Sequence, residues 1–165
     1  MSTASMSPDP SSRLLLRHTL ATLAYRGGKA LRDAPPGFEK TCACEGGRSA
    51  GEVLSHVGDL FDWAASMVRG KTVWRASAPL PWDEEVERFF ATLSAFDAAL
   101  EEAADLPMPP ERIFQGPIAD ALTHVGQISM LRRIAGAPVK AENYAVASIT
   151  VGRVGADQAA PVVEF

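Results

Sequence analysis

The sequence predicts an all-α protein, built as a four-helix bundle with an irregular C-terminal tail. Four stretches repeat apolar residues at the helical spacing of three and four, and clusters of glycine and proline separate them. No stretch before the tail alternates polar and apolar residues as a half-buried strand does. Four amphipathic helices joined only by loops bury their apolar stripes most simply against one another, which favours a bundle.

The composition is that of one globular domain. The chain has 165 residues, 47% hydrophobic and 22% charged, and its 16 Lys+Arg against 20 Asp+Glu give a net charge of -4. A chain of this length buries roughly 70% of its unfolded surface without needing a disulfide or a structural metal. The acidic balance argues against nucleic acid as a partner, because backbone binding needs clustered cations. No apolar run reaches the ~20 residues of a membrane span, so we expect no signal peptide, anchor or membrane partner. The two cysteines give no secreted disulfide framework, so we expect a cytoplasmic protein.

Three segments are expected along the chain. Residues 1–12 are rich in serine and proline and predict a flexible lead, and residues 13–138 form the bundle. Residues 139–165 mix valine, alanine and isoleucine with glycine and lack a helical period. We expect this tail to pack on the bundle or on a partner subunit, and to border the mouth of the functional pocket with Tyr144 and Arg153 as its polar groups.

The first two helices have clear sequence boundaries. The first is expected over residues 12–32 and ends before Pro35 and Pro36. The second begins at Ser49, because Ser49 and Glu52 have the spacing of a capping box, and it runs to about residue 70. Each carries one apolar stripe.

The last two helices are expected over residues 82–106 and 116–136. In the third, Asp97 falls within the apolar face, where a carboxylate is costly unless it is bonded or charge-paired. It is expected either beside a metal site or exposed by a shift in register. A short turn over residues 110–114 precedes the fourth helix, which has Pro117 at its first position. The fourth helix is apolar almost all round, which predicts the most buried member of the bundle.

Three polar residues on inward strips predict a metal site. His56 borders the apolar stripe of the second helix, and Asp120 and His124 lie four residues apart on one side of the fourth. Two imidazoles and a carboxylate ligate divalent ions and leave coordination positions open, as in a catalytic site rather than a closed structural one. The alternative is that each is an ordinary hydrogen-bonded residue of the core or rim.

Several other residues also predict structural or chemical features. The segments 55–58 (Ser-His-Val-Gly) and 123–126 (Thr-His-Val-Gly) echo each other, and their helical glycines predict close helix approach. His18 lies opposite the leucine stripe and is expected to face solvent or a dimer contact. Cys42 and Cys44 are too close in sequence for an unstrained mutual disulfide, and reactive thiols or soft-metal ligands are the alternative to plain loop residues. The three tryptophans are expected in core and rim packing.

A histidine early in the second helix, followed by His124-Val125-Gly126-Gln127 and Leu131-Arg132-Arg133 in the fourth, resembles the DinB/YfiT-like superfamily of metal-binding bundles over roughly residues 14–138. The resemblance implies an up-down-down-up helix order, a tendency to dimerise, and nickel, zinc or a similar ion held by three histidines. His56 and His124 match two of them, and Asp120 stands where the family usually has its middle histidine. A carboxylate there makes the site harder and favours Mn, Fe or Mg as well.

The resemblance also implies an activity, because characterised members include thiol-dependent transferases and isomerases. We expect a divalent-metal-dependent enzyme of the thiol-transferase or hydrolase type, acting as a homodimer on a small molecule such as a low-molecular-weight thiol. Glu52 and Asp59, one turn before and after His56, are the expected base or orienting groups. The alternatives are a non-catalytic bundle that binds a metal or small ligand, and a bundle without a ligand.

Overall fold

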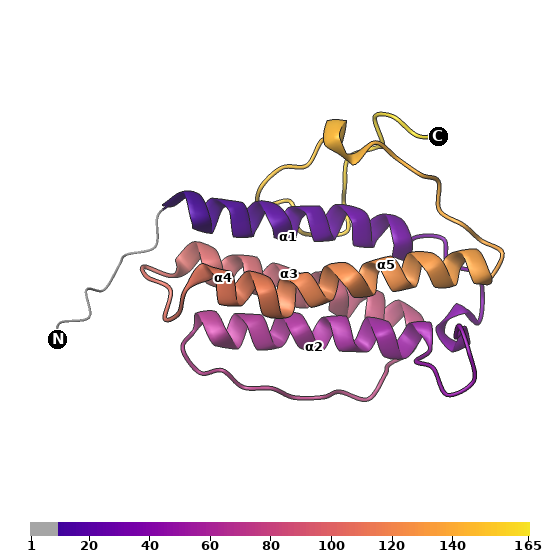
Figure 1. Ribbon diagram of the computed structural model, residues 1–165, viewed down its shortest axis with the longest axis horizontal. Helices are drawn as coiled ribbons and strands as arrows, with labels where there is room; N and C mark the ends of the chain where they lie inside the picture. Colours follow the sequence, from indigo (N-terminus) through magenta and orange to yellow (C-terminus); the bar gives the residue numbers. More distant parts are fainter. Residues whose placement is uncertain (1–9) are drawn as a thin grey trace.

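In the computed structural model, which describes residues 10–165, four long helices lie side by side (Figure 1). They are α1 (Pro10–Leu31), α2 (Ala50–Val68), α3 (Trp82–Glu102) and α5 (Ala119–Ile134). The shorter elements are η1 (Phe38–Lys40), α4 (Pro110–Ile113), the π turn η2 (Phe114–Ile118) and η3 (Tyr144–Val146). The prediction of an all-α four-helix bundle is confirmed.

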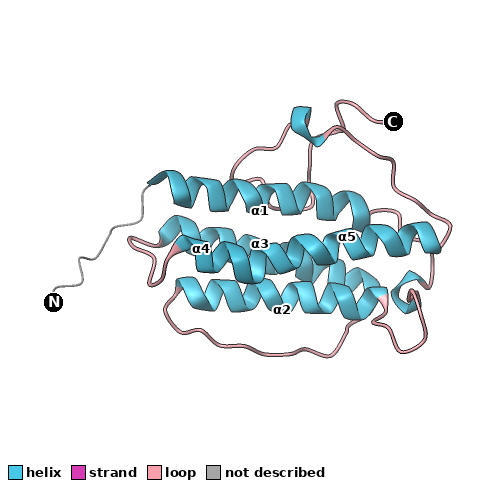
Figure 2. Ribbon diagram, viewed as in Figure 1, coloured by secondary structure: helices cyan, strands magenta, loops and turns pink. Residues whose placement is uncertain are grey.

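The helices are arranged so that each has two main neighbours. α2 packs against α3 and α5, and α1 packs against the same two helices. α1 and α5 run in one direction and α2 and α3 in the other (Figure 1). Because α2 and α3 are parallel neighbours, the chain must return along the 19 residues of α2, about 28 Å, before α3 begins. Residues 69–81 make this return as an extended strap, drawn below α2 in Figure 2, and residues 71–80 are all exposed.

The hydrophobic core lies between the four long helices. α2 is its most buried member, with 14 of its 19 residues buried against 6 of the 16 in α5. The expectation that the fourth helix is the most buried is therefore wrong, because Thr123, Gly126 and Gln127 form an open face on α5. None of the described helices is both long and apolar enough to cross a membrane. The largest side chains with under 2% exposure are Phe38, Phe61, Phe89, Phe96, Leu20, Leu23, Leu54, Leu93, Leu100, Ile113, Ile118 and Ile128.

Two helix ends differ from the sequence expectation. α1 begins at Pro10, inside the lead expected to be flexible, because proline is well accommodated at the first helical position; residues 1–9 of that lead lie outside the described residues. α3 ends at Glu102 rather than near Leu106, since Ala103 is already extended with ψ 121°. Leu106 nevertheless packs against the core from the irregular segment that follows.

The start of the fourth helix also differs. Helical structure is continuous from Pro110 to Ile134, and Pro117 lies inside it, in the π turn over residues 114–118. Proline has no N–H to donate and its ring crowds the preceding turn of a regular α-helix. The wider π turn accommodates it, so proline does not mark the helix start here.

The C-terminal tail packs against α1, at the top of Figure 1. The Glu142 carboxylate is fully buried and accepts hydrogen bonds from the Tyr25 hydroxyl at 2.6 Å and the Lys29 ammonium at 2.7 Å. Burial, reinforced by the bond to Glu142, raises the pKa of Tyr25 to about 12. Lys29 also bonds Glu164 at 2.7 Å, and Val154 reaches the core. The tail is thus tied to the helix that lies diagonally opposite α2.

Candidate metal centre

His56 of α2 and Asp120 and His124 of α5 meet where these two helices pack. One ligating atom from each of the three lies within 4.8 Å of the other two. His56 Nε2 is 3.4 Å from Asp120 Oδ2, His124 Nδ1 is 3.1 Å from Asp120 Oδ1, and the imidazole centroids are 4.8 Å apart. The structure therefore brings together the three residues that the sequence selected.

The apolar stripes of the two helices determine this convergence. Val53 and Val57, on either side of His56, are buried, and they turn that face of α2 toward the bundle. Ala121 and Val125 do the same beside His124 on α5. The side chains of His56, Asp120 and His124 keep 20%, 43% and 10% of their surface exposed, so the group is reachable from solvent.

The His124 ring is oriented by its own helix. Its Nδ1 lies 2.8 Å from the backbone carbonyl oxygen of Asp120. A carbonyl oxygen only accepts, so Nδ1 is the donor in this hydrogen bond, and Nε2 is the ring nitrogen that can face an ion. Metal-binding histidines commonly donate their second ring nitrogen to a carbonyl in this way, which fixes both tautomer and ring orientation.

The donor set fits a divalent ion. In a tetrahedral site with bonds of about 2.0–2.1 Å, neighbouring ligand atoms are about 3.4 Å apart, which matches the spacing of His56 Nε2 and Asp120 Oδ2. The widest pair in the group lies within 4.8 Å, so it closes by up to about 1.4 Å to reach the tetrahedral spacing on binding. Asp120 has the freedom to do so, because its side chain is 43% exposed.

Two tryptophans form the wall beside His56. Trp74 of the strap lies 5.7 Å, centroid to centroid, from both His56 and Trp63. Trp63 and Trp82 are rim residues as expected, and Trp82 stacks edge-on against Phe38. The contact of Trp74 with the site was not predicted, although a tryptophan in the linker between two expected helices was an available signal.

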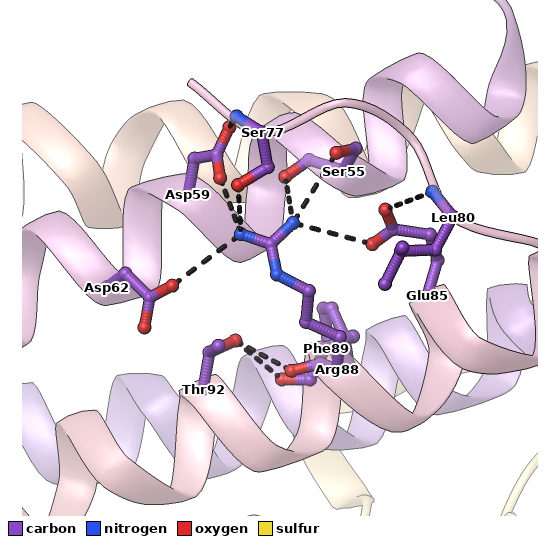
Figure 3. A network of polar contacts seen from close by, with 9 residues as sticks. All are labelled: Ser55, Asp59, Asp62, Ser77, Leu80, Glu85, Arg88, Phe89 and Thr92. Carbon is purple, nitrogen blue, oxygen red and sulfur yellow. Dashed lines mark hydrogen bonds and ion pairs between the residues drawn. The ribbon is translucent and has the colours of Figure 1, made fainter. Parts of the chain in front are cut away.

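Glu52 and Asp59 lie outside this group. The Glu52 carboxylate accepts the Ser49 N–H at 2.7 Å, which completes the predicted capping box and lowers the pKa of Glu52. Asp59 faces α3, where its carboxylate accepts from Arg88 and from the Ser77 N–H at 2.9 Å (Figure 3). Burial alone would raise the pKa of Asp59, but these bonds outweigh it and hold the pKa below the usual value. Both carboxylates accept hydrogen bonds from neighbouring residues that hold local structure, and neither is placed to act as a base at the metal centre.

The network in Figure 3 holds the strap to the bundle. Glu85, fully buried, accepts the Leu80 N–H at 2.9 Å, while Arg88 donates to the Ser55 carbonyl oxygen at 3.2 Å. Since Ser77 and Leu80 belong to the strap, the network fixes the half of the strap that leads into α3.

Two other sequence expectations need correction. Asp97 is buried but is neither beside the metal centre nor exposed, because Arg17 of α1 donates to both its oxygens at 2.9 and 2.8 Å. Close helix approach holds at Gly58, where an added Cβ would lie 3.0 Å from the Arg88 guanidinium carbon. It fails at Gly126, whose added Cβ would meet nothing within 4 Å.

A groove of about 420 Å³ begins at His124 and extends to the loop that precedes α2. Its volume falls in the range of small-molecule sites. The tail does not contribute to it, so the expectation that the tail borders this pocket is wrong. Cys42 and Cys44 lie in the same loop as exposed free thiols, and His18 is exposed on α1 as expected. The groove is lined by Ala43, Gly47, Arg48, Val53, His124, Gln127, Met130 and Leu131.

Comparisons with protein-family models, with curated proteins and with solved structures found no match to this chain. The functional interpretation therefore depends on the geometry of the metal centre and the groove.

Proposed function

We propose that the protein is a divalent-metal-dependent enzyme whose ion is bound by His56, Asp120 and His124. The observation that carries this proposal is the convergence of the three ligating atoms within 4.8 Å from two different helices. The hydrophobic core is a continuous cluster of apolar side chains, so the fold does not depend on a structural ion. Three protein ligands next to an open groove are the arrangement of a catalytic metal, which keeps positions for water or substrate.

The proposed reaction is transfer to or from a thiol, or hydrolysis, with a small molecule such as a low-molecular-weight thiol as substrate. When bound, nickel, zinc, manganese or iron would lower the pKa of a coordinated thiol or water and so supply a nucleophile at neutral pH. The Asp120 carbonyl holds the His124 ring in position, and the Trp74 ring packs edge-on against the His56 ring. The groove at His124 provides room for the second reactant.

The chain is further proposed to be a DinB-like bundle. Two features support this: α1 and α5 run opposite to α2 and α3, and the histidines lie on α2 and α5. Both agree with what the sequence resemblance implies. Asp120 in place of the middle histidine is the departure from that pattern.

A homodimer is part of the same proposal. The docked tail leaves several apolar side chains exposed, with Val146 at 48%, Val162 at 57%, Val163 at 39% and Phe165 at 78%. Apolar surface gathered in one segment is typical of an interface. A second copy of the chain would cover it.

Elemental analysis of protein purified without an affinity tag tests the metal site. We expect about one ion per chain in the wild type and in the control His18→Ala, whose imidazole is exposed on α1. His56→Ala and His124→Ala should lose the ion and keep their helical circular dichroism, because the core does not include the metal. Asp120→His should bind zinc or nickel more tightly. A wild type that binds no added divalent ion at micromolar concentration, or a His56→Ala variant that binds as well, contradicts the proposal.

Water-proton relaxation of the Mn²⁺-loaded protein distinguishes an enzyme from a non-catalytic metal-binding bundle. An open site keeps exchangeable water on the ion and enhances relaxation, and displacement of that water by an added thiol should reduce the enhancement. An ion without exchangeable water indicates a closed shell and favours the non-catalytic alternative.

A further inference from the structure

The groove at His124 has a floor of apolar side chains and three polar lining residues, His124, Gln127 and Arg48. Val53 and Leu131 are almost fully buried at 2% and 4% exposure, and Met130 adds a flexible apolar side chain that is 54% exposed. His124 lies at one end, and Arg48, in the loop before α2, also lines the groove. Such a lining selects a ligand with an apolar body and polar groups at its ends.

The Arg48 guanidinium is free to bind a ligand. Within residues 10–165 it makes no hydrogen bond and no ion pair, in contrast to Arg17, Arg88 and Arg132, which are all bonded within the bundle. Its charge helps to lower the pKa of Glu52, after the larger effect of the Ser49 hydrogen bonds that this carboxylate accepts.

The charge of the groove indicates the kind of anion. Of the described residues that line it, Arg48 alone carries a permanent positive charge and none carries a carboxylate. A single planar guanidinium matches a carboxylate in charge and in its two-oxygen geometry. A phosphate monoester, with close to two negative charges, would be left partly uncompensated in this groove.

We infer that the groove binds a small amphipathic carboxylate, with its carboxylate on Arg48 and its apolar body on Val53, Met130 and Leu131. The opposite end of the molecule then faces His124, which places it beside the metal centre. The inference names the substrate class of the proposed enzyme. It rests on that function only for the group that faces His124, because binding of the carboxylate by Arg48 requires no metal.

Calorimetric titration with 4-phenylbutyrate and with its neutral amide, 4-phenylbutanamide, tests the inference. The metal-free wild type should bind the carboxylate about tenfold or more tightly than the amide, as expected for a charge-assisted hydrogen bond. Arg48→Gln should remove this preference. The control Arg133→Gln, in the last turn of α5 and outside the groove, should keep it. Met130→Glu should weaken binding of both probes, because it places a charge on the apolar floor.

Equal binding of the two probes, unchanged carboxylate binding by Arg48→Gln, or no binding of either probe at millimolar concentration would overturn the inference. The same titrations with zinc separate it from the metal proposal. A chain that fails to bind zinc yet keeps Arg48-dependent carboxylate binding refutes the metal proposal alone. A chain that binds zinc through His56 and shows no carboxylate preference refutes this inference alone.

Discussion

Replacing Arg88 with methionine tests whether a buried charge network holds the strap. The Arg88 guanidinium donates to Asp59, to the Ser55 carbonyl oxygen at 3.2 Å and to the Ser77 hydroxyl at 3.2 Å, and it lies 3.6 Å from Glu85 Oε2 (Figure 3). The Asp59 and Glu85 side chains are 5% and 0% exposed. Arg88→Met keeps most of the apolar stem but leaves two buried carboxylates without their cation.

The expected loss of stability in Arg88→Met follows from the burial of these carboxylates. Removing one partner of a buried ion pair costs about 3–5 kcal/mol. Because the Arg88 side chain is 16% exposed, water partly screens the pair, and we expect a loss near the lower end, about 3 kcal/mol. The folded pKa of Asp59 lies below its usual 3.8, so the stabilisation is present above pH 3.8 and is lost as the pH falls through the folded value. The difference between wild type and variant should therefore shrink in acid.

Urea unfolding followed by circular dichroism at pH 7 measures the effect. The matched control is Arg69→Met. Among residues 10–165, the exposed Arg69 side chain reaches only the Ala95 carbonyl oxygen at 3.5 Å, so its loss should change stability by less than about 0.5 kcal/mol. Trypsin should also cut Arg88→Met faster at Arg75, which lies in the exposed strap two residues before Ser77. If Arg88→Met unfolds like Arg69→Met and resists trypsin like the wild type, the network does not hold the strap.

Three further predictions concern other parts of the molecule. Gly27→Ala should lower stability by about 1–3 kcal/mol in thermal unfolding, because the added Cβ would lie 2.5 Å from Phe89 Cζ. A gain in stability would contradict the packing described. Ultraviolet titration should show one of the two tyrosines, Tyr25, ionising at about pH 12. The stability that the protonated Tyr25 hydroxyl contributes is present below pH 10 and is lost as the pH rises toward 12. Ionisation of both tyrosines near pH 10 would refute this prediction. Light scattering at micromolar concentration should give twice the chain mass of 17.6 kDa, with Val162→Lys shifting it toward monomer, and a monomeric wild type would exclude the dimer.

Local sequence signals predicted the parts of the fold that local chemistry determines. Ser49 and Glu52 marked the start of α2 because both halves of a capping box lie within four residues. Asp120 and His124 were identified together because residues four apart share a helix face. Their convergence with His56 required only that both apolar stripes face one core.

Features that depend on contacts distant in sequence were not predictable in this way. Asp97 needed Arg17, 80 residues away, to explain its burial. The docking of the tail depends on Glu142 and Tyr25, 117 residues apart, and nothing near either residue indicates that pairing. Trp74 reaches His56 only because parallel α2 and α3 require a strap that runs back along α2.

The π turn before α5 means that this helix contains one residue more than a regular helix would need over the same stretch. Ile113 and Ile118 are both fully buried although they lie five residues apart, a spacing that puts side chains about 140° apart on a regular α-helix. The wider turn brings them to the same side. A regular helix over the same residues would rotate Asp120 and His124 by about 100° relative to Ile113. The extra residue taken up by the π turn, which also accommodates Pro117, therefore keeps both ligands directed at α2.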